Sequence, residues 1–380
     1  MVLAPIDYQS PITQAFEPYM SDLGQAPTDA IMSGAQAVGP DSRSSQNPDD
    51  SIHRDSAIWF EDGNIVAIAQ NTAFRFHKGV LSLHSQVFRD LFSVPQPSSV
   101  GSAGTAQTFD GYPAVHVTDT SYDFRELLRA IYYGGVSHLH PDEAVTLPVL
   151  AALARLSHKY QLDQLLDAVI LRLKRTFTTD FETWERSGCL HEELSPMQIS
   201  CSDCIEALNL FRLLDKTEMI PVALYGCSQL EIADLFSGVT RHDGVTPEGL
   251  SPHDLQLCLE IKLNLTQTAV SIMMALCDAV QARITQVSSN QGCFSPVVCG
   301  PNLAAFQDRI RHHVCCHING DPLALSYSCQ VDSLVDIGRI CRSCGDATRE
   351  AHLRLRREVW MILPDRVGLD IDGWGSAYIE

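Results

Sequence analysis

Residues 73–92 read AFRFHKGVLSLHSQVFRDLF, and this stretch decides the fold of the N-terminal half. It opens as a strand, because Phe74 and Phe76 fall on one side of an alternating pattern. It continues as two short helical turns whose apolar residues share one face. Ser85 is placed to cap the second turn by accepting a hydrogen bond from a backbone N–H near Phe88. The stretch is typical of a core-building unit and does not resemble a catalytic centre.

The sequence around this stretch predicts a small sheet covered by helices. Residues 64–69 and 72–77 form two strand patterns joined at Gln70-Asn71, and a further short strand is expected over 114–117. Helices are predicted where apolar residues recur every three to four positions. These helices cover 120–134, Leu147–Tyr160 and 162–173.

Two segments are predicted to be mobile. Residues 1–51 contain six prolines among Ser, Gln, Ala and Asp, and such a tail buries too little apolar surface to offset its chain entropy. Residues 95–108 are rich in Pro, Ser and Gly, which is typical of an exposed loop.

Beyond Phe177 strand-like alternation disappears and helical patterns dominate. The sequence therefore predicts an α+β protein in which a small sheet flanked by helices precedes a mainly α-helical C-terminal domain. We expect a disordered tail over 1–51, a first domain over 52–177 and a helical domain over 178–380. The expected helices of the second domain lie at 201–214, 221–236, 266–287, 302–314 and 347–362.

The composition restricts the classes of partner. The chain has 380 residues, a formal net charge of −19 and 45% apolar residues, which fits a globular protein that repels phosphates. Direct nucleic-acid binding is not expected, because the negative net charge repels phosphates. Membrane association is not expected either, because no apolar run approaches the roughly 20 residues that span a bilayer. The N-terminus lacks the features of a secretory signal. The thirteen cysteines then indicate a reducing, intracellular location, cytoplasmic or nuclear.

Motifs for catalysis are absent from the sequence. It contains no phosphate-binding GxxxxGK or GxGxxG, no HExxH and no GxSxG. No catalytic and no cofactor-binding residue is assigned, and the chain is interpreted as a non-enzyme. The alternative is a metal-dependent or thiol enzyme in the cysteine-rich C-terminal half.

The cysteines leave one question open. Cys341-x-x-Cys344 lies between Gly338 and Gly345, a turn-like context in which two thiolates can grip zinc. Cys315 and Cys316, with His317, are candidates for the remaining ligands. Further candidates are Cys293, Cys299 and Cys329. The competing interpretation is that these cysteines are small buried apolar residues with no cofactor.

Four sequence blocks occur in an order that resembles a BTB/POZ domain. They are FRFHKGVLSLHSQVFRDLF (74–92), AVHVTD (114–119), FRELLRAIYYGG (124–135) and LARLSHKYQLDQLLDAVILRL (153–173). The resemblance covers residues 52–177 and extends to the BTB domains of long fungal, basidiomycete-type proteins. Residues 356–374, RREVWMILPDRVGLDIDGW, resemble the end of such proteins.

The resemblance implies a protein–protein interaction module. BTB domains usually self-associate and recruit protein partners, so a scaffold or regulatory adaptor is expected. Transcription regulation and ubiquitin ligase adaptor roles both occur in the family. The implied interface residues are Lys78, Val80, Leu81 and Leu83. A homodimer through them is expected; the alternative is a monomer whose helical half covers this surface.

Overall fold

The computed structural model describes residues 52–93, 108–134, 144–186, 197–289, 291–316 and 320–375. The side chains of 197–198 and 315–316 are not included in this description. The predicted tail 1–51 and nearly all of the predicted loop 95–108 lie outside the described residues.

The described part of the chain begins with the predicted small sheet and its helices, and a mainly helical part follows, so the predicted fold class is confirmed. In the first 186 residues the elements are β1 His53–Trp59, β2 Ile65–Ala69, β3 Thr72–Phe76, α1 Lys78–His84, α2 Gln86–Ser93, β4 Thr108–Phe109, β5 Tyr112–Val117, α3 Ser121–Tyr133, β6 Val145–Thr146, α4 Leu147–Tyr160, α5 Asp163–Lys174 and α6 Phe181–Arg186. The later elements are β7 Met197–Gln198, α7 Asp203–Leu213, the 3-10 helix η5 Thr217–Met219, α8 Ile220–Ser228, α9 Ile232–Ser237, β8 Val239–Thr240, β9 Pro247–Glu248, α10 Pro252–Ser288, α11 Pro296–Cys316, α12 Ser326–Asp336 and α13 Arg342–Arg366.

The main sheet has the strand order β1-β3-β2-β5-β4. Strands β2 and β3 form the predicted antiparallel hairpin, with Ala69 opposite Thr72, and β5 pairs with β2 in parallel. The β4–β5 hairpin turns at Asp110-Gly111, where both residues have positive φ. This conformation is typical of the two-residue turns that match strand twist.

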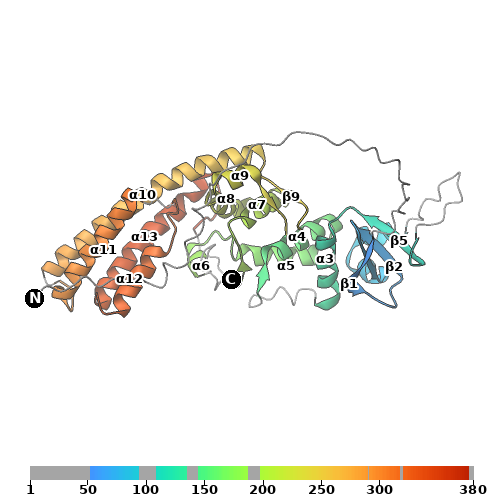
Figure 1. The fold of residues 1–380 in the computed structure, drawn as a ribbon, viewed down its shortest axis with the longest axis horizontal. Coiled ribbons are helices and arrows are strands. Elements are labelled where there is room, and N and C mark those ends of the chain that lie inside the picture. The colour runs from blue at the N-terminus through green and yellow to red at the C-terminus, as the bar shows by residue number, and fades with distance from the viewer. Residues whose placement is uncertain are drawn as a thin grey trace, which may run out of the picture. The chain divides into compact units, whose positions relative to one another are not determined.

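Side chains on the two faces of β3 enter different cores. Phe74 and Phe76 face the helices, where Phe74 contacts Phe124 of α3 at a ring-centroid distance of 5.4 Å. Ala73 faces the opposite side with Val66. The alternation therefore has the phase that the sequence predicts. Figure 1 shows α3 beside the sheet formed by β1, β2 and β5.

One hydrophobic cluster runs from the sheet into the helical part. We call it the main cluster; it extends from Ile58 to Trp374 and includes side chains of α7, α8 and the first half of α10. Buried ion pairs reinforce this junction, since Arg155 of α4 bonds both Asp123 of α3 and Glu206 of α7. The boundary expected at 177 is therefore crossed by a continuous core.

A second, smaller cluster lies between α10, α11, α12 and α13. We call it the distal cluster, and α10 and α13 each contribute side chains to both clusters. Its buried members are Ala269, Met273, Leu276, Cys277, Val280, Val287, Cys299, Leu303, Phe306, Ile310, Val331, Ile340 and Cys344.

Helix α10 is longer than predicted. It begins at Pro252 because Ser251 caps it, accepting a hydrogen bond from the Asp254 backbone N–H at 3.1 Å. By length and composition alone, α10 is apolar enough to cross a membrane, a feature that the sequence analysis missed. Its side chains nevertheless pack in both clusters, and Lys262 donates to the carbonyls of Ser228 and Leu230.

Candidate functional site

Helix α1, the helix named by the family resemblance, is fixed at both ends. At its start, the Lys78 N–H donates to the Asn64 side chain at 2.9 Å, and the His77 N–H donates to the Tyr132 hydroxyl at 2.9 Å. At its end, the hydroxyl of Ser85 accepts from the Phe88 N–H at 3.1 Å, as the sequence predicts. The same hydroxyl donates to the Tyr160 carbonyl. The helix is therefore a rigid platform.

The four implied interface residues on α1 differ in exposure. Leu81 is fully buried in the main cluster and is not available to a partner. Lys78 is exposed, Val80 is half-buried, and Leu83 exposes 75% of its surface. Leu83 is therefore the apolar member of the set that is most accessible to solvent.

A hollow of about 370 Å³ opens beside Leu83. Its apolar lining comes from Ala130 and Ile131 of α3 and from Leu162 and Leu165 near the start of α5. Its polar rim includes His84, Gln161, Asp163 and Gln164. The hollow and Leu83 together form what we call the α1 face.

The polar groups near Lys78 are arranged within the chain itself. The Asn64 side-chain oxygen is occupied by the Lys78 N–H at the start of α1. Asp62 lies 3.2 Å from the His77 ring, which lowers the pKa of the carboxyl first through this hydrogen bond. The Asp62 carboxylate is therefore paired with His77.

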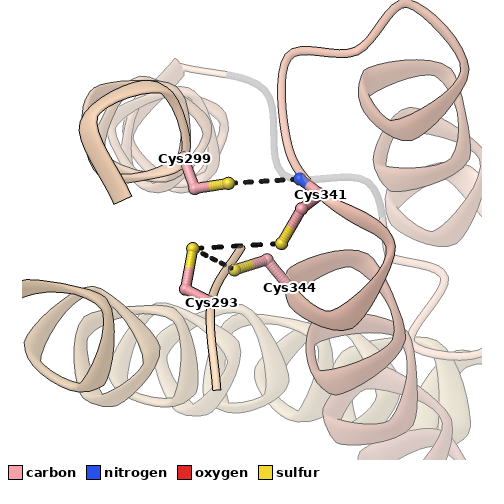
Figure 2. Close-up of side chains that lie close together, drawn as sticks. All are labelled: Cys293, Cys299, Cys341 and Cys344. Carbon is pink, nitrogen blue, oxygen red and sulfur yellow. Dashed lines mark hydrogen bonds between the residues drawn. The ribbon is translucent and has the colours of Figure 1, made fainter. Parts of the chain in front are cut away.

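A second site is formed by four cysteines where two helices begin (Figure 2). Cys293 lies in the connection between α10 and α11, and Cys299 lies in the first turn of α11. Cys341 is the N-cap of α13, and Cys344 lies in the first turn of that helix. The four sulfur atoms all lie within 4.8 Å of one another. We call this set the thiol cluster.

The sulfurs are close but not covalently joined. The Cys293 and Cys344 sulfurs are 3.6 Å apart, and those of Cys293 and Cys341 are 3.9 Å apart. A disulfide requires about 2.05 Å. The Cys341 N–H also donates to the Cys299 sulfur at 3.1 Å, as Figure 2 shows. Cys299 and Cys344 are buried, while Cys293 and Cys341 are half-buried.

The surroundings of the thiol cluster favour one ionised sulfur. Burial raises the pKa of Cys341, but hydrogen bonds from the backbone N–H groups of Phe294 and Cys344 outweigh it, and the pKa falls to about 6. Burial raises the pKa of Cys344 and also that of Cys299. Hydrogen bonding therefore favours the thiolate of Cys341, whereas burial favours the protonated thiols of Cys344 and Cys299.

The structure brings only some of the predicted metal ligands together. Cys341 and Cys344 come together, but Cys293 and Cys299 accompany them instead of Cys315 and Cys316. The side chains of Cys315 and Cys316 lie outside the described residues, as does His317. Their positions at the C-terminal end of α11 lie about 24 Å along the helix axis from Cys299. Cys329 is exposed on α12 and does not belong to the thiol cluster.

The chain contains a recognisable interaction domain. Residues 62–176 match the family model of the BTB/POZ domain. This domain is a protein–protein interaction module that supports protein binding and dimerisation. A comparison with curated proteins finds no match.

Proposed function

We propose that this protein is a scaffold or regulatory adaptor that pairs with a second copy of itself through the α1 face. The observation that carries the proposal is the exposed Leu83 beside an apolar hollow, within residues that match a BTB/POZ domain. Protein partners other than the second copy would be recruited by the resulting pair. The setting we propose is intracellular, in the cytoplasm or the nucleus.

The shape of the α1 face suits a symmetric pair. In a two-fold interface each copy presents the same patch, so a projection must lie next to a matching recess. Leu83 and the hollow lined by Ile131 and Leu162 satisfy this requirement within one patch. Inserting each Leu83 into the partner's hollow would remove two apolar side chains from water, each contributing about 1.5–3 kcal/mol.

The rigidity of α1 adds to this argument. Ser85 and Tyr132 hold the helix through hydrogen bonds at its two ends, so little conformational entropy remains to be lost on pairing. Lys78 is exposed and forms no ion pair within the described residues, which leaves its charge for a carboxylate of the partner. The pair would therefore have an apolar centre and a charged rim.

The test is the oligomeric state of the full chain. Light scattering at micromolar concentration should report a dimer for the wild type and a monomer for Leu83→Asp, because a buried carboxylate without a partner is costly. The matched control is Leu263→Asp, which changes another exposed leucine, 69% accessible, on α10. This variant should remain dimeric.

Other results would contradict the proposal. A monomeric wild type across the micromolar range would exclude self-association as the working mode. A Leu83→Asp variant that is still dimeric, with an unchanged melting temperature, would place the interface elsewhere on the chain.

A further inference from the structure

The thiol cluster has the composition and size of a metal site. Four sulfurs from Cys293, Cys299, Cys341 and Cys344 share a volume in which every pair lies within 4.8 Å. A tetrahedral ion with metal–sulfur bonds of about 2.3 Å requires sulfurs about 3.8 Å apart. The separations of 3.6 and 3.9 Å from Cys293 bracket this value. We propose that these four cysteines bind one Zn²⁺ as a closed structural site.

The ligand set selects the ion. Four thiolates in tetrahedral arrangement suit zinc or a single iron, whereas hard cations such as Mg²⁺ and Ca²⁺ prefer oxygen ligands. A four-iron cluster places a separate iron at each cysteine and so spreads the sulfurs further apart. The compact set of sulfurs therefore fits one ion. Zinc is preferred to a single iron because Zn²⁺ does not change oxidation state.

The local charges also suit four thiolates around a divalent ion, a group with a net charge of −2. Arg283 donates to the Cys344 sulfur at 3.4 Å and to the Gly292 carbonyl. Arg283 also donates to the side chains of Gln286 and Ser343, which hold its positive charge beside the sulfurs. Backbone N–H groups of Phe294, Cys341 and Cys344 donate to sulfurs as well. Such outer contacts hold ligands in place and offset their charge.

Two helix N-termini also direct positive potential toward the thiol cluster. Cys299 and Cys344 lie in the first turns of α11 and α13, where the unpaired backbone N–H groups concentrate positive potential. A cysteine that served only as a small buried apolar residue would not require N–H donors around its sulfur.

A closed site of this kind is structural. With all four positions filled by protein sulfurs, no position is left for water or substrate, which a catalytic zinc requires. Cys299 and Cys344 are also members of the distal cluster. The ion would therefore join the starts of α11 and α13 and the end of α10, closing the outer end of the distal cluster.

The metal content of the full chain tests the site directly. Protein purified under reducing conditions from zinc-supplied cells should contain about one zinc per chain by mass spectrometry. The double variant Cys299→Ser, Cys344→Ser should contain none. Cys329→Ser is the matched control and should keep the metal, because Cys329 is exposed and lies outside the thiol cluster.

A second measurement on the unmutated chain guards against a variant that does not fold. Adding Co²⁺ after removal of zinc should produce the charge-transfer and visible bands of a tetrathiolate site. Bound metal should also protect the four thiols from alkylation while Cys329 reacts.

Three outcomes would overturn the zinc proposal. They are wild-type protein with well under one zinc per chain, equal zinc in the double variant, and a disulfide between cluster cysteines in freshly isolated protein. None of these results depends on the oligomeric state, so this test and that of the α1 face are independent.

Discussion

The main cluster and the distal cluster are joined by the same two helices but are stabilised differently. In the main cluster the rings of Phe88 and Tyr160 stack at 4.2 Å, and those of Trp360 and Trp374 stack at 5.0 Å. The distal cluster is smaller, and its outer end is formed by sulfur atoms. Helices α10 and α13 pass through both.

Helices α10 and α13 therefore pass through two different surroundings: apolar side chains in the main cluster, and apolar side chains together with four sulfur atoms in the distal cluster. The stability of the main cluster comes from apolar area, which varies little with redox conditions. A small helical unit buries less apolar surface and gains more from a cross-link. Under our proposal, chelation or oxidation would loosen the distal cluster first and leave the α1 face intact.

The largest effect is expected from Phe88→Ala. Phe88 is buried between Tyr160 and Phe92, so the truncation should lower the free energy of unfolding by about 3–5 kcal/mol. Urea unfolding measures the loss, and hydrogen exchange locates it. If the two clusters are separate units, protection should fall in the main cluster and persist in α11.

The control for this variant is Leu263→Ala, which changes an exposed side chain of α10 outside the α1 face and should alter stability by no more than about 0.5 kcal/mol. An equal loss of protection in both clusters for Phe88→Ala would show that they unfold as one unit. An unchanged melting temperature would refute the packing of Phe88.

A somewhat smaller effect, dependent on pH, is expected from Arg155→Met. The guanidinium bonds Glu206 at 2.6 Å and Asp123 at 3.1 Å, and its loss removes the nearest cation from two buried carboxylates, leaving Glu206 only the more distant Arg241 at 3.9 Å. The cost should be about 3 kcal/mol at pH 7. This variant measures how much of the stability of the main cluster comes from the buried ion pairs of Arg155 rather than from apolar area.

The pH dependence follows from Glu206. Burial raises its pKa above the usual 4.5 although Arg155 and Arg241 lower it, so the folded chain takes up this proton at a higher pH than the unfolded chain does. The contribution of Glu206 to stability is therefore fully present below 4.5 and is lost as pH rises through the folded pKa. Without Arg155 the pKa rises further.

Urea unfolding should consequently show a smaller loss for Arg155→Met at pH 5 than at pH 7. Arg129→Met is the control, since Arg129 forms an exposed pair with Glu126 that contributes at most about 1 kcal/mol. A loss that is the same at both pH values would mean that the carboxylates do not cause it.

Local signals in the sequence predict strands β2, β3 and β5 and the helices that follow them. The Phe74–Phe76 alternation and the Ser85 cap depend on neighbours within a few residues, and the structure has both. Helix α10 was predicted too short, although Ser251, Pro252 and Asp254 are a readable helix start.

The spacing of the cysteines predicts only two members of the thiol cluster as a pair. Cys341-x-x-Cys344 places two sulfurs together by local geometry alone, so spacing was enough to find them. Cys293 and Cys299 are joined to that pair only by the packing of α10, α11 and α13, which no local pattern encodes. Adjacency suggested Cys315 and Cys316 instead, and the length of α11 carries those positions away.

The smallest effect is expected from Ser85→Ala, at the end of helix α1. The Ser85 hydroxyl accepts from the Phe88 N–H and donates to the Tyr160 carbonyl, so alanine leaves both groups unpaired in a buried position. Loss of such a cap should cost about 1–2 kcal/mol by urea unfolding. Ser82→Ala on α1 is the matched control and should change stability by less than about 0.5 kcal/mol. If Ser85→Ala is equally mild, the connection between α1 and α2 is held by the packing of Leu81 and Phe88 rather than by this hydroxyl.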